Sequence, residues 1–336
     1  MNAVVFREHG DPGVLVYTDI ETPAPASGEV LVRVRATTVN RADTVVRRGY
    51  PGLVIPLPHV PGGDIAGTIE ALGEGVAGWT PGDRVVCHPL ALEAGYSGDE
   101  FWRVGWQYFG MHRQGSYAEL VNVPASCLVR LPDHVPFEMG ACVPVAALTA
   151  EHALNVGGVG AGTTLFYWGG AGGLGTMLVQ LAKRRGARVL TTVGSPDRRR
   201  LLESLGADLV IDRHTQDVPT EVRAFAPTGV DVVLDYVGPA TFPVSFGMLR
   251  PGGTLLWCGM ISGREVTVNV QATYLKHASI RGLFLGSMRE LRDLVGHLAA
   301  GELVPHLHMV MPLAEARRGH EMMERGEHAG KVVLVP

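Results

Sequence analysis

A glycine-rich turn near the middle of the chain is the sequence feature that most restricts its fold. Thr163–Trp168 has the composition of a buried strand, and Met177–Ala182 has the pattern of a helix. Between them, glycines at positions 170, 172 and 175 have the spacing G-x-G-x-x-G, which suits a tight turn, close approach of backbone N–H groups to a pyrophosphate, and close helix–strand packing. We therefore predict a dinucleotide-binding loop, with a plain glycine-rich turn as the alternative. Its residues are Gly170, Ala171, Gly172, Gly173, Leu174 and Gly175.

The end of the next predicted strand, Arg188–Val193, bears on which dinucleotide binds. Folds that prefer NAD place Asp or Glu there to accept a hydrogen bond from the ribose 2′-hydroxyl, but this sequence has Gly194 and Ser195. Ser195 and Arg198 carry donors for a 2′-phosphate, which favours NADPH as the cofactor. A structural alternative is compatible with this prediction, since Ser195 followed by Pro196 is a typical helix start with Arg198 on a solvated face.

Strand and helix patterns change along the chain in a way that predicts two domains. A chain of 336 residues is longer than one hydrophobic core usually supports. Up to about Val123 the apolar runs are short and alternating, as in a twisted β module. After Pro124, strands alternate with helices, which predicts an α/β doubly wound domain with a parallel sheet. The tail returns to mixed texture, so we expect one domain at 1–124 with 287–336 and the other at 125–286.

Charge and cysteine content exclude several classes of protein. The formal net charge of −4 gives no field that attracts nucleic acid or an anionic membrane. The four cysteines are far apart and form no CxxC pair, so we expect neither a disulfide framework nor a cysteine zinc knuckle. Charged residues occur early in the N-terminal segment, before the apolar core of a signal peptide could form. No uncharged apolar run reaches the ~18 residues of a membrane span. A cytoplasmic protein with small-molecule partners is expected.

Short motifs follow one another along nearly the whole chain. They are VNRAD at 39–43, VPGGDIAG at 60–67, GDRV at 82–85, GSYAE at 115–119, the glycine loop, LGAD at 205–208, LRPGG at 249–253 and GKVVL at 330–334. In this order they resemble the zinc-free medium-chain dehydrogenases/reductases of the quinone oxidoreductase (zeta-crystallin-like) group. The resemblance implies a GroES-like catalytic domain made from both chain ends, a Rossmann domain, and an active site in the cleft between them.

The resemblance also bears on metal content. Zinc-dependent relatives place a cysteine, a histidine and a second cysteine at positions that match Asn40, Gly63 and Val145. An amide, a glycine and a valine do not replace those ligands, so no catalytic zinc is expected. The lobe matching the relatives' structural zinc, at 89–112, has none of its cysteines. Without a Lewis acid, reduction of a conjugated C=C bond or a quinone is favoured over alcohol oxidation.

Roles for individual residues are also implied by the resemblance. Asn40 matches an asparagine beside the nicotinamide ribose and is expected to position it, with a turn-capping asparagine as the alternative. Tyr50 lies near the tyrosine that enoyl reductases use as proton donor, with an aromatic cleft wall as the alternative and solvent as the other proton source. The remaining cofactor-binding residues carried over are Thr149, Arg213, Gly259, Phe284, Leu285 and Gly286.

Other noticeable residues are expected to be structural. Asp43 and Asp64 are expected to hold the fold through backbone or arginine contacts, for example with Arg47, because a solvated Asp is a poor acid at neutral pH. His306 and His308 share a face of a predicted strand but have no third metal ligand nearby. Aromatic residues of the former zinc lobe are expected to repack it, with a substrate wall or a subunit contact as the alternative. These are Tyr96, Phe101, Trp102, Trp106, Tyr108 and Phe109.

Together these features predict an NADPH-dependent oxidoreductase that transfers hydride to an α,β-unsaturated carbonyl or a quinone without catalytic zinc. The alternative is a non-catalytic NADPH-binding protein of the zeta-crystallin type, which the glycine loop fits equally well. The resemblance further implies a homodimer formed by edge pairing of two Rossmann sheets.

Overall fold

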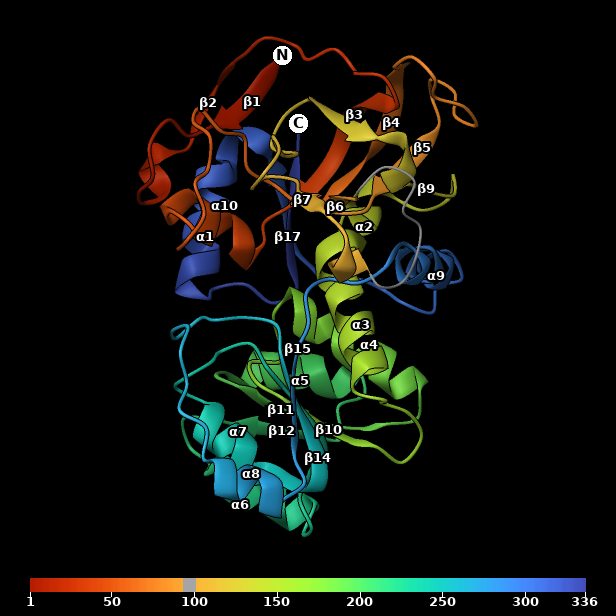
Figure 1. Cartoon of the computed structure of the whole chain (residues 1–336). Helices are drawn as coiled ribbons and strands as arrows, with labels where there is room; N and C mark the ends of the chain where they lie inside the picture. Colours follow the sequence, from red (N-terminus) through yellow and green to blue (C-terminus); the bar gives the residue numbers. More distant parts are fainter. Residues whose placement is uncertain (93–100) are drawn as a thin grey trace. The chain divides into compact units, whose positions relative to one another are not determined.

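Both ends of the chain fold into one unit. The computed structural model describes residues 1–92 and 101–336; Tyr96, one of the aromatic candidates, lies outside them. Unit 1 comprises 1–148 and 286–336, and unit 2 comprises 149–285. In Figure 1 the red and orange N-terminal strands and the blue C-terminal strand β17 belong to the same body. The predicted fold class, a GroES-like β domain plus a doubly wound parallel-sheet domain, is confirmed.

A seven-stranded sheet forms the centre of unit 1. Its order is β16-β17-β3-β4-β5-β9, with β8 paired to β3, and small two-stranded sheets β1-β2 and β6-β7 accompany it. Alternate residues Val30, Val32 and Val34 of β3 are buried in its core. The strands are β1 (Asn2–Val5), β2 (Val16–Asp19), β3 (Glu29–Thr38), β4 (Ile65–Leu72), β5 (Arg84–Cys87), β6 (Leu90–Leu92), β7 (Trp106–Tyr108), β8 (Leu120–Pro124), β9 (Leu128–Arg130), β16 (Leu307–Pro312) and β17 (Lys331–Val335).

The last strand, β17, brings the tail of the chain against β3. Its register pairs Val333 with Thr38 and Leu334 with Thr37. Lys331, the first residue of β17, is thereby placed near the end of β3 and the start of α1. The helical segments of unit 1 are α1 (Arg41–Arg48), α2 (Phe137–Gly140), the π-helical turn η4 (Val143–Ala147), α9 (Met288–Ala299), α10 (Ala316–Arg325) and the short 3-10 turns η1 (Pro12–Val14), η2 (Phe101–Arg103), η3 (Ala125–Cys127) and η5 (Leu313–Glu315).

Residues 125–148, which the sequence assigns to the second domain, lie in unit 1. The physical reason is strand pairing, because β9 hydrogen-bonds to β5, with Cys87 opposite Leu128. The change of texture after Pro124 marks the end of β8 and not the start of the parallel sheet.

Unit 2 is built on a six-stranded parallel sheet of order β12-β11-β10-β13-β14-β15. The order reverses between β10 and β13, which is where such sheets bind ligands at their carboxyl ends. Its strands are β10 (Thr164–Tyr167), β11 (Arg188–Val193), β12 (Leu209–Asp212), β13 (Val230–Asp235), β14 (Leu249–Trp257) and β15 (Ser279–Gly282). Its helices are α3 (Leu148–Val156), α4 (Gly173–Arg184), α5 (Pro196–Ser204), α6 (Val218–Phe225), α7 (Phe242–Met248) and α8 (Val270–Leu275). Across the described ranges, none of the helices is long and apolar enough to cross a membrane.

Candidate active site

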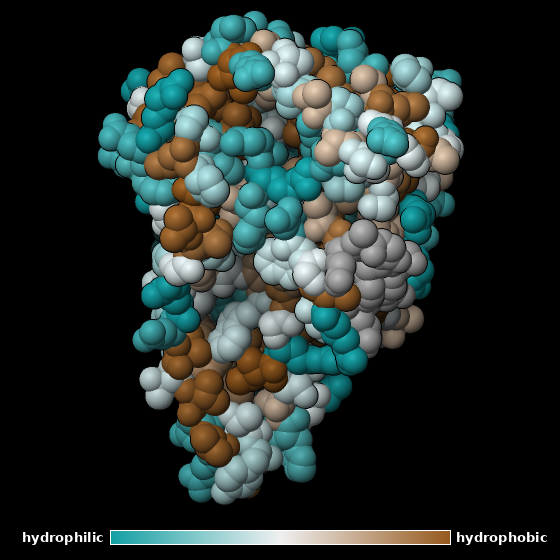
Figure 2. Space-filling view, turned by 45° about the horizontal axis from the view of Figure 1, so that its top comes forward, coloured by the Kyte–Doolittle hydropathy of each residue, from teal (hydrophilic) through white to brown (hydrophobic). Residues whose placement is uncertain are grey.

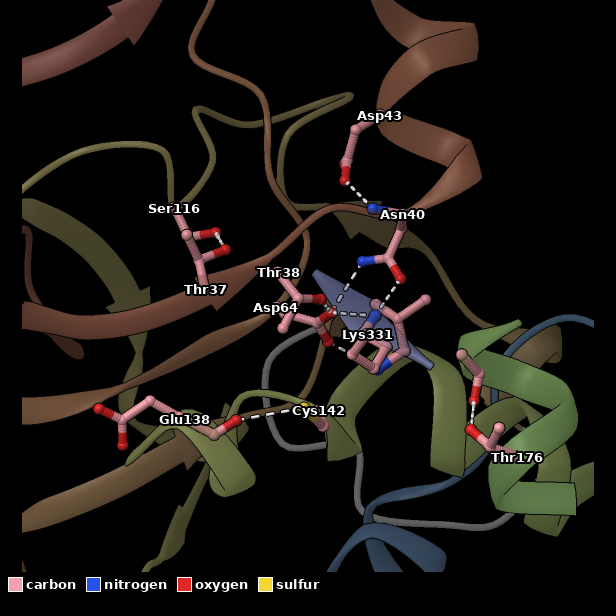
Figure 3. Close-up of polar contacts among 12 residues, drawn as sticks. Thr37, Thr38, Asn40, Asp43, Asp64, Ser116, Glu138, Cys142, Thr176 and Lys331 are labelled. Atoms are coloured by element: carbon pink, nitrogen blue, oxygen red, sulfur yellow. Dashed lines mark hydrogen bonds and ion pairs between the residues drawn. The ribbon is translucent and has the colours of Figure 1, made fainter. Parts of the chain in front are cut away.

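A buried polar cluster lies where β3, β4 and β17 of unit 1 meet (Figure 3). The Asp64 Oδ2 atom accepts hydrogen bonds from the Thr38 hydroxyl, from Asn40 Nδ2 at 2.7 Å and from Lys331 Nζ at 3.2 Å. Lys331 Nζ also donates to Asn40 Oδ1 at 2.6 Å. The three side chains Asn40, Asp64 and Lys331 are all buried. Charge pairing and hydrogen bonds offset the large cost of burying both charges.

The other oxygen of Asp64 ties this cluster to the π-helical turn. Asp64 Oδ1 accepts the backbone N–H of Val145 at 2.9 Å. Gly63 directly precedes Asp64, and the Asp64 carboxylate contacts both Asn40 and Val145. The three positions that match metal ligands in zinc-dependent relatives therefore lie close together. Among residues 1–92 and 101–336, no group of three or more His, Cys, Asp or Glu side chains is arranged to hold a metal ion.

Two tyrosines pack against the glycine pair that precedes Asp64. A Cβ added to Gly63 would overlap the hydroxyl of Tyr108, and one added to Gly62 would lie 2.5 Å from Cδ1 of Tyr117. Both tyrosines are buried, and burial together with the charges of Asp43 and Asp64 raises the pKa of each phenol. Sequence analysis assigns no role to Tyr117 and counts Tyr108 among the aromatic residues that repack the former zinc lobe. The adjacent glycines, Gly62 and Gly63, are the sequence signal that bulky side chains come close here.

A second buried group connects α1 to α10. The Asp43 carboxylate accepts the backbone N–H of Asn40 at 2.8 Å, and the Tyr117 hydroxyl lies 3.5 Å from Asp43 Oδ2 and 3.2 Å from His320 Nε2. Burial raises the pKa of Asp43 to about 7, and burial followed by the charge of Arg47 lowers the pKa of His320 to about 3. At neutral pH His320 is therefore uncharged, and burial favours the protonated form of Asp43 relative to an exposed aspartate.

Of the two kinds of contact expected for the aspartates, the structure shows the backbone contacts, and Arg47 has a different partner. Arg47 is fully buried on α1 and donates to Glu324 of α10. The cation that Asp64 contacts is Lys331, which lies 267 positions along the chain. Sequence spacing favours Arg47 as a partner one turn from Asp43, whereas strand pairing of β17 with β3 delivers the lysine.

Tyr50 lies just beyond α1 and is half-buried. In the described part of the chain its hydroxyl has no hydrogen bond to the Asp64 cluster. The backbone carbonyl of Tyr50 accepts the N–H of Leu53 at 3.1 Å in the turn that follows. Its role as a proton donor stays a prediction.

The glycine loop of unit 2 has the predicted strand–turn–helix setting, with β10 ending at Tyr167 and α4 beginning at Gly173. A Cβ on Gly175 would overlap the carbonyl of Gly170, so the helix packs against the turn as only glycine allows. The Gly170 N–H donates to the Thr192 carbonyl at 2.9 Å, which fixes the loop to β11. Ala171 and Gly175 are buried, while Gly172, Gly173 and Leu174 are half-buried at the helix N-terminus. This geometry suits an anion such as pyrophosphate.

Basic and hydroxyl groups gather at the carboxyl end of β11. Ser195 is the N-cap residue of α5 with Pro196 following, as the structural interpretation predicts, but its side chain makes no capping hydrogen bond. The Cβ position of Gly194 lies 2.7 Å from Nη2 of Arg213, so the exposed Arg213 guanidinium covers the strand end. The nearest following carboxylate, Asp197, pairs with Arg200. Arg198 is half-buried on the first turn of α5.

The remaining carried-over residues are divided between the units. Thr149 is buried at the start of unit 2, and Gly259 follows β14 with its Cβ position 2.5 Å from the carbonyl of Tyr236. Leu285, the last residue of unit 2, has a left-handed backbone with φ of 55°. Gly286 begins the second stretch of unit 1, where its carbonyl accepts from His88 Nε2 at 2.8 Å. Phe284 is exposed.

Comparison with known proteins gives the same two-part organisation. The alcohol dehydrogenase GroES-like domain matches residues 26–133, and the zinc-binding dehydrogenase domain matches residues 173–300. The chain is 31% identical over 316 residues to a zinc-type alcohol dehydrogenase-like protein of Schizosaccharomyces pombe, covering 91% of this chain and 90% of that protein. It is 30% identical over 346 residues to the quinone oxidoreductase of Lama guanicoe, covering 100% and 97%. A crystal structure described as an NAD-dependent alcohol dehydrogenase has a TM-score of 0.93 at 34% identity, with both chains covered completely.

The parallel sheet with its glycine loop and the GroES-like unit define a nicotinamide-dinucleotide-dependent oxidoreductase. The chain belongs to the medium-chain dehydrogenase/reductase family and is similar to the quinone oxidoreductases within it. Although the matching domain is described as zinc-binding, the residues at the matching positions here do not fit that metal. An amide, a glycine and a valine stand there, and the Tyr108 hydroxyl fills the volume beside Gly63.

Proposed function

We propose that this protein is an NADPH-dependent reductase of α,β-unsaturated carbonyl compounds or quinones that works without catalytic zinc. The observation that carries the proposal is the Asp64 cluster, in which Asn40, one of the positions that match metal ligands in zinc-dependent relatives, is an amide bound to Asp64 and Lys331. With an amide, a glycine and a valine at the three positions that match metal ligands, an alkoxide has little stabilisation there, whereas a conjugated acceptor spreads its negative charge over several atoms.

The preference for NADPH over NADH rests on the end of β11. The position of the ribose-binding carboxylate is taken by Gly194 and Ser195, and the Arg213 guanidinium lies against Gly194. A hydrogen bond to a charged group contributes about 1.5–3 kcal/mol, enough for roughly a ten- to hundredfold preference. A structural relative is described as NAD-dependent, so coenzyme choice has to be measured for this chain.

Each residue then has a defined task. NADPH, when bound, supplies the hydride that reaches the β-carbon of the acceptor. Asn40 orients the nicotinamide ribose, and Tyr50 gives a proton to the α-carbon of the enolate so that the C=C bond is reduced with charge balance. Thr149, Gly259, Phe284, Leu285 and Gly286 line the cofactor in this proposal, and Arg213 contacts its adenosine end.

Oxidation of NADPH with a panel of enones, enals and quinones tests this function. Turnover of at least one class, with a lower KM for NADPH than for NADH, is the expected result. Tight NADPH binding with no turnover on the whole panel would instead favour the non-catalytic zeta-crystallin-type role.

We further propose that the protein is a cytoplasmic homodimer formed through the edge of the unit 2 sheet. The edge strand β15 pairs with β14, and exposed apolar residues Val270, Tyr274 and Leu275 lie on the adjacent α8. Figure 2 shows hydrophobic residues on the surface of the lower part of the molecule, which belongs to unit 2. Sedimentation of the wild type as a dimer and of Leu275→Arg as a monomer is expected; a monomeric wild type contradicts the proposal.

A further inference from the structure

Lys331 is a buried cation to which the sequence analysis assigns no role, although it lies in the motif GKVVL at 330–334. Its side chain is 3% exposed, and that of its partner Asp64 is 0% exposed. The backbone at this point is fixed as well, because the Lys331 N–H donates to the His306 carbonyl at 2.8 Å and a Cβ on the preceding Gly330 would overlap that same carbonyl. A lysine held this firmly in the protein interior needs both of its hydrogen-bonding partners, Asp64 and Asn40.

The two charged groups fix the orientation of the Asn40 amide. An ammonium group donates only and an ionised carboxylate accepts only. Asn40 Oδ1 must therefore face Lys331 Nζ and Asn40 Nδ2 must face Asp64 Oδ2, as the distances of 2.6 and 2.7 Å show. A flipped amide would place its NH₂ group against the ammonium and its oxygen against the carboxylate.

This arrangement leaves the amide with a defined remaining capacity. Nδ2 keeps one hydrogen, because Asp64 accepts only the other, while Oδ1 faces both Lys331 Nζ and, through the capping box, the backbone N–H of Asp43. Donation from the ammonium to Oδ1 polarises the amide and strengthens its remaining N–H as a donor. Asn40 is 8% exposed, so only a small part of the residue is open to a ligand.

Three further hydrogen bonds hold Asp64 and Asn40 in this arrangement. Asp64 is fixed by the Thr38 hydroxyl and by the N–H of Val145, which come from the end of β3 and from η4. The backbone N–H of Asn40 is held separately by Asp43. Asn40 is also the N-cap residue of α1 and forms a capping box with Asp43, so the start of α1 helps to hold the amide in place.

We propose that Lys331, together with Asp64, is a positioning residue that sets and polarises the Asn40 amide for the nicotinamide half of the cofactor. The proposal rests on the proposed function, because it requires Asn40 to contact the nicotinamide ribose. It adds a residue near the carboxyl terminus of the chain and assigns it an action through Asn40, not on the substrate itself.

Coenzyme binding separates this role from a structural one. The probes are NADPH and adenosine 2′,5′-bisphosphate, which lacks both the nicotinamide and the ribose attached to it. Lys331→Met and Asn40→Ala should each weaken NADPH binding about tenfold and leave the affinity for the nicotinamide-free probe unchanged. Because Lys331→Met leaves Asp64 buried without its cation, the Asp64→Asn/Lys331→Met variant, in which both charges are removed, is measured beside it.

A double-mutant cycle shows whether Lys331 acts through Asn40. In the Asn40→Ala background, Lys331→Met should cause no further loss of NADPH affinity, and any further fall in kcat should be less than twofold. Arg113→Met is the matched control, because it breaks the Arg113–Glu29 ion pair of the same unit without touching Asn40. Its NADPH affinity should equal that of the wild type.

Two results would overturn the proposal. Additive losses in the cycle, or equal losses for both probes, would show that Lys331 only stabilises the fold. A wild type that binds the nicotinamide-free probe as tightly as NADPH would remove the premise that Asn40 meets the nicotinamide half. Failure of the proposed reductase activity looks different, since NADPH binding and the cycle would then hold while no acceptor is turned over.

Discussion

The hydroxyl of Tyr108 occupies the volume that any side chain at Gly63 would need. A tyrosine from β7 therefore fills the site of a residue that zinc-dependent relatives use as a metal ligand. A histidine at 63 and a tyrosine at 108 therefore exclude each other in this backbone.

This exclusion predicts a coupling between the two positions. Gly63→Ala should destabilise the protein by about 1–3 kcal/mol, because the new methyl group forces the buried Tyr108 ring to shift. In a Tyr108→Ala background the same substitution should cost much less, since the space is then open. Urea denaturation of the four proteins measures this, and equal costs in both backgrounds would show that the ring does not limit position 63.

Asp43 predicts a loss of stability as pH rises. Its folded pKa of about 7 lies above the unfolded value of 3.8, so the folded state binds more protons between these values. The stabilisation is full below 3.8 and is lost as pH rises through 7, with a slope of at most about 1.4 kcal/mol per pH unit. Asp43→Asn keeps an acceptor for the Asn40 N–H and should remove this slope. A stability profile between pH 4 and 8 that is unchanged in this variant contradicts the assignment.

His320 predicts the opposite dependence. Its pKa falls from 6.5 to about 3 on burial, so its contribution is full above 6.5 and is lost as pH falls toward 3. His320→Gln should therefore unfold at a lower pH than the wild type when acid titration is followed by circular dichroism. His214→Gln is the control, since it replaces an exposed histidine of unit 2 and should leave the acid midpoint unchanged.

The glycine loop and the parallel sheet were predictable from sequence because their signals are local. The turn Gly170–Gly175, strand β10 and helix α4 all lie within about twenty residues, and a Cβ on Gly170 or Gly175 would overlap neighbouring atoms. The Asp64 cluster was not predictable in the same way. Lys331 meets Asp64 and Asn40 only through the pairing of β17 with β3, and neither charge pattern nor motif spacing reports a contact of that range.

Tyr50 gives a prediction about chemistry. If its hydroxyl donates the proton to the α-carbon, Tyr50→Phe should lower kcat by about 10²- to 10⁴-fold with little change in the affinity for NADPH. The measurement is turnover of the best acceptor from the panel, with the stereochemistry of the α-proton determined in deuterated water. Unchanged turnover would assign proton donation to solvent.

Substitutions at the end of β11 are expected to shift the coenzyme preference from NADPH toward NADH. In Ser195→Glu/Arg198→Ala a carboxylate is placed at the end of β11 and a cation is removed, so the new side chain accepts from a ribose 2′-hydroxyl and repels a 2′-phosphate. The ratio of kcat/KM for NADPH to that for NADH should fall by about one to two orders of magnitude, in line with the strength of one charged hydrogen bond.

Because Arg213 lies against Gly194, the single variant Arg213→Ala should account for a further part of the preference. Arg200→Ala is the control, since that arginine is engaged by Asp197 on an exposed face of α5 and its loss should leave the ratio unchanged. A double variant that still prefers NADPH would show that the 2′-phosphate is recognised elsewhere on unit 2.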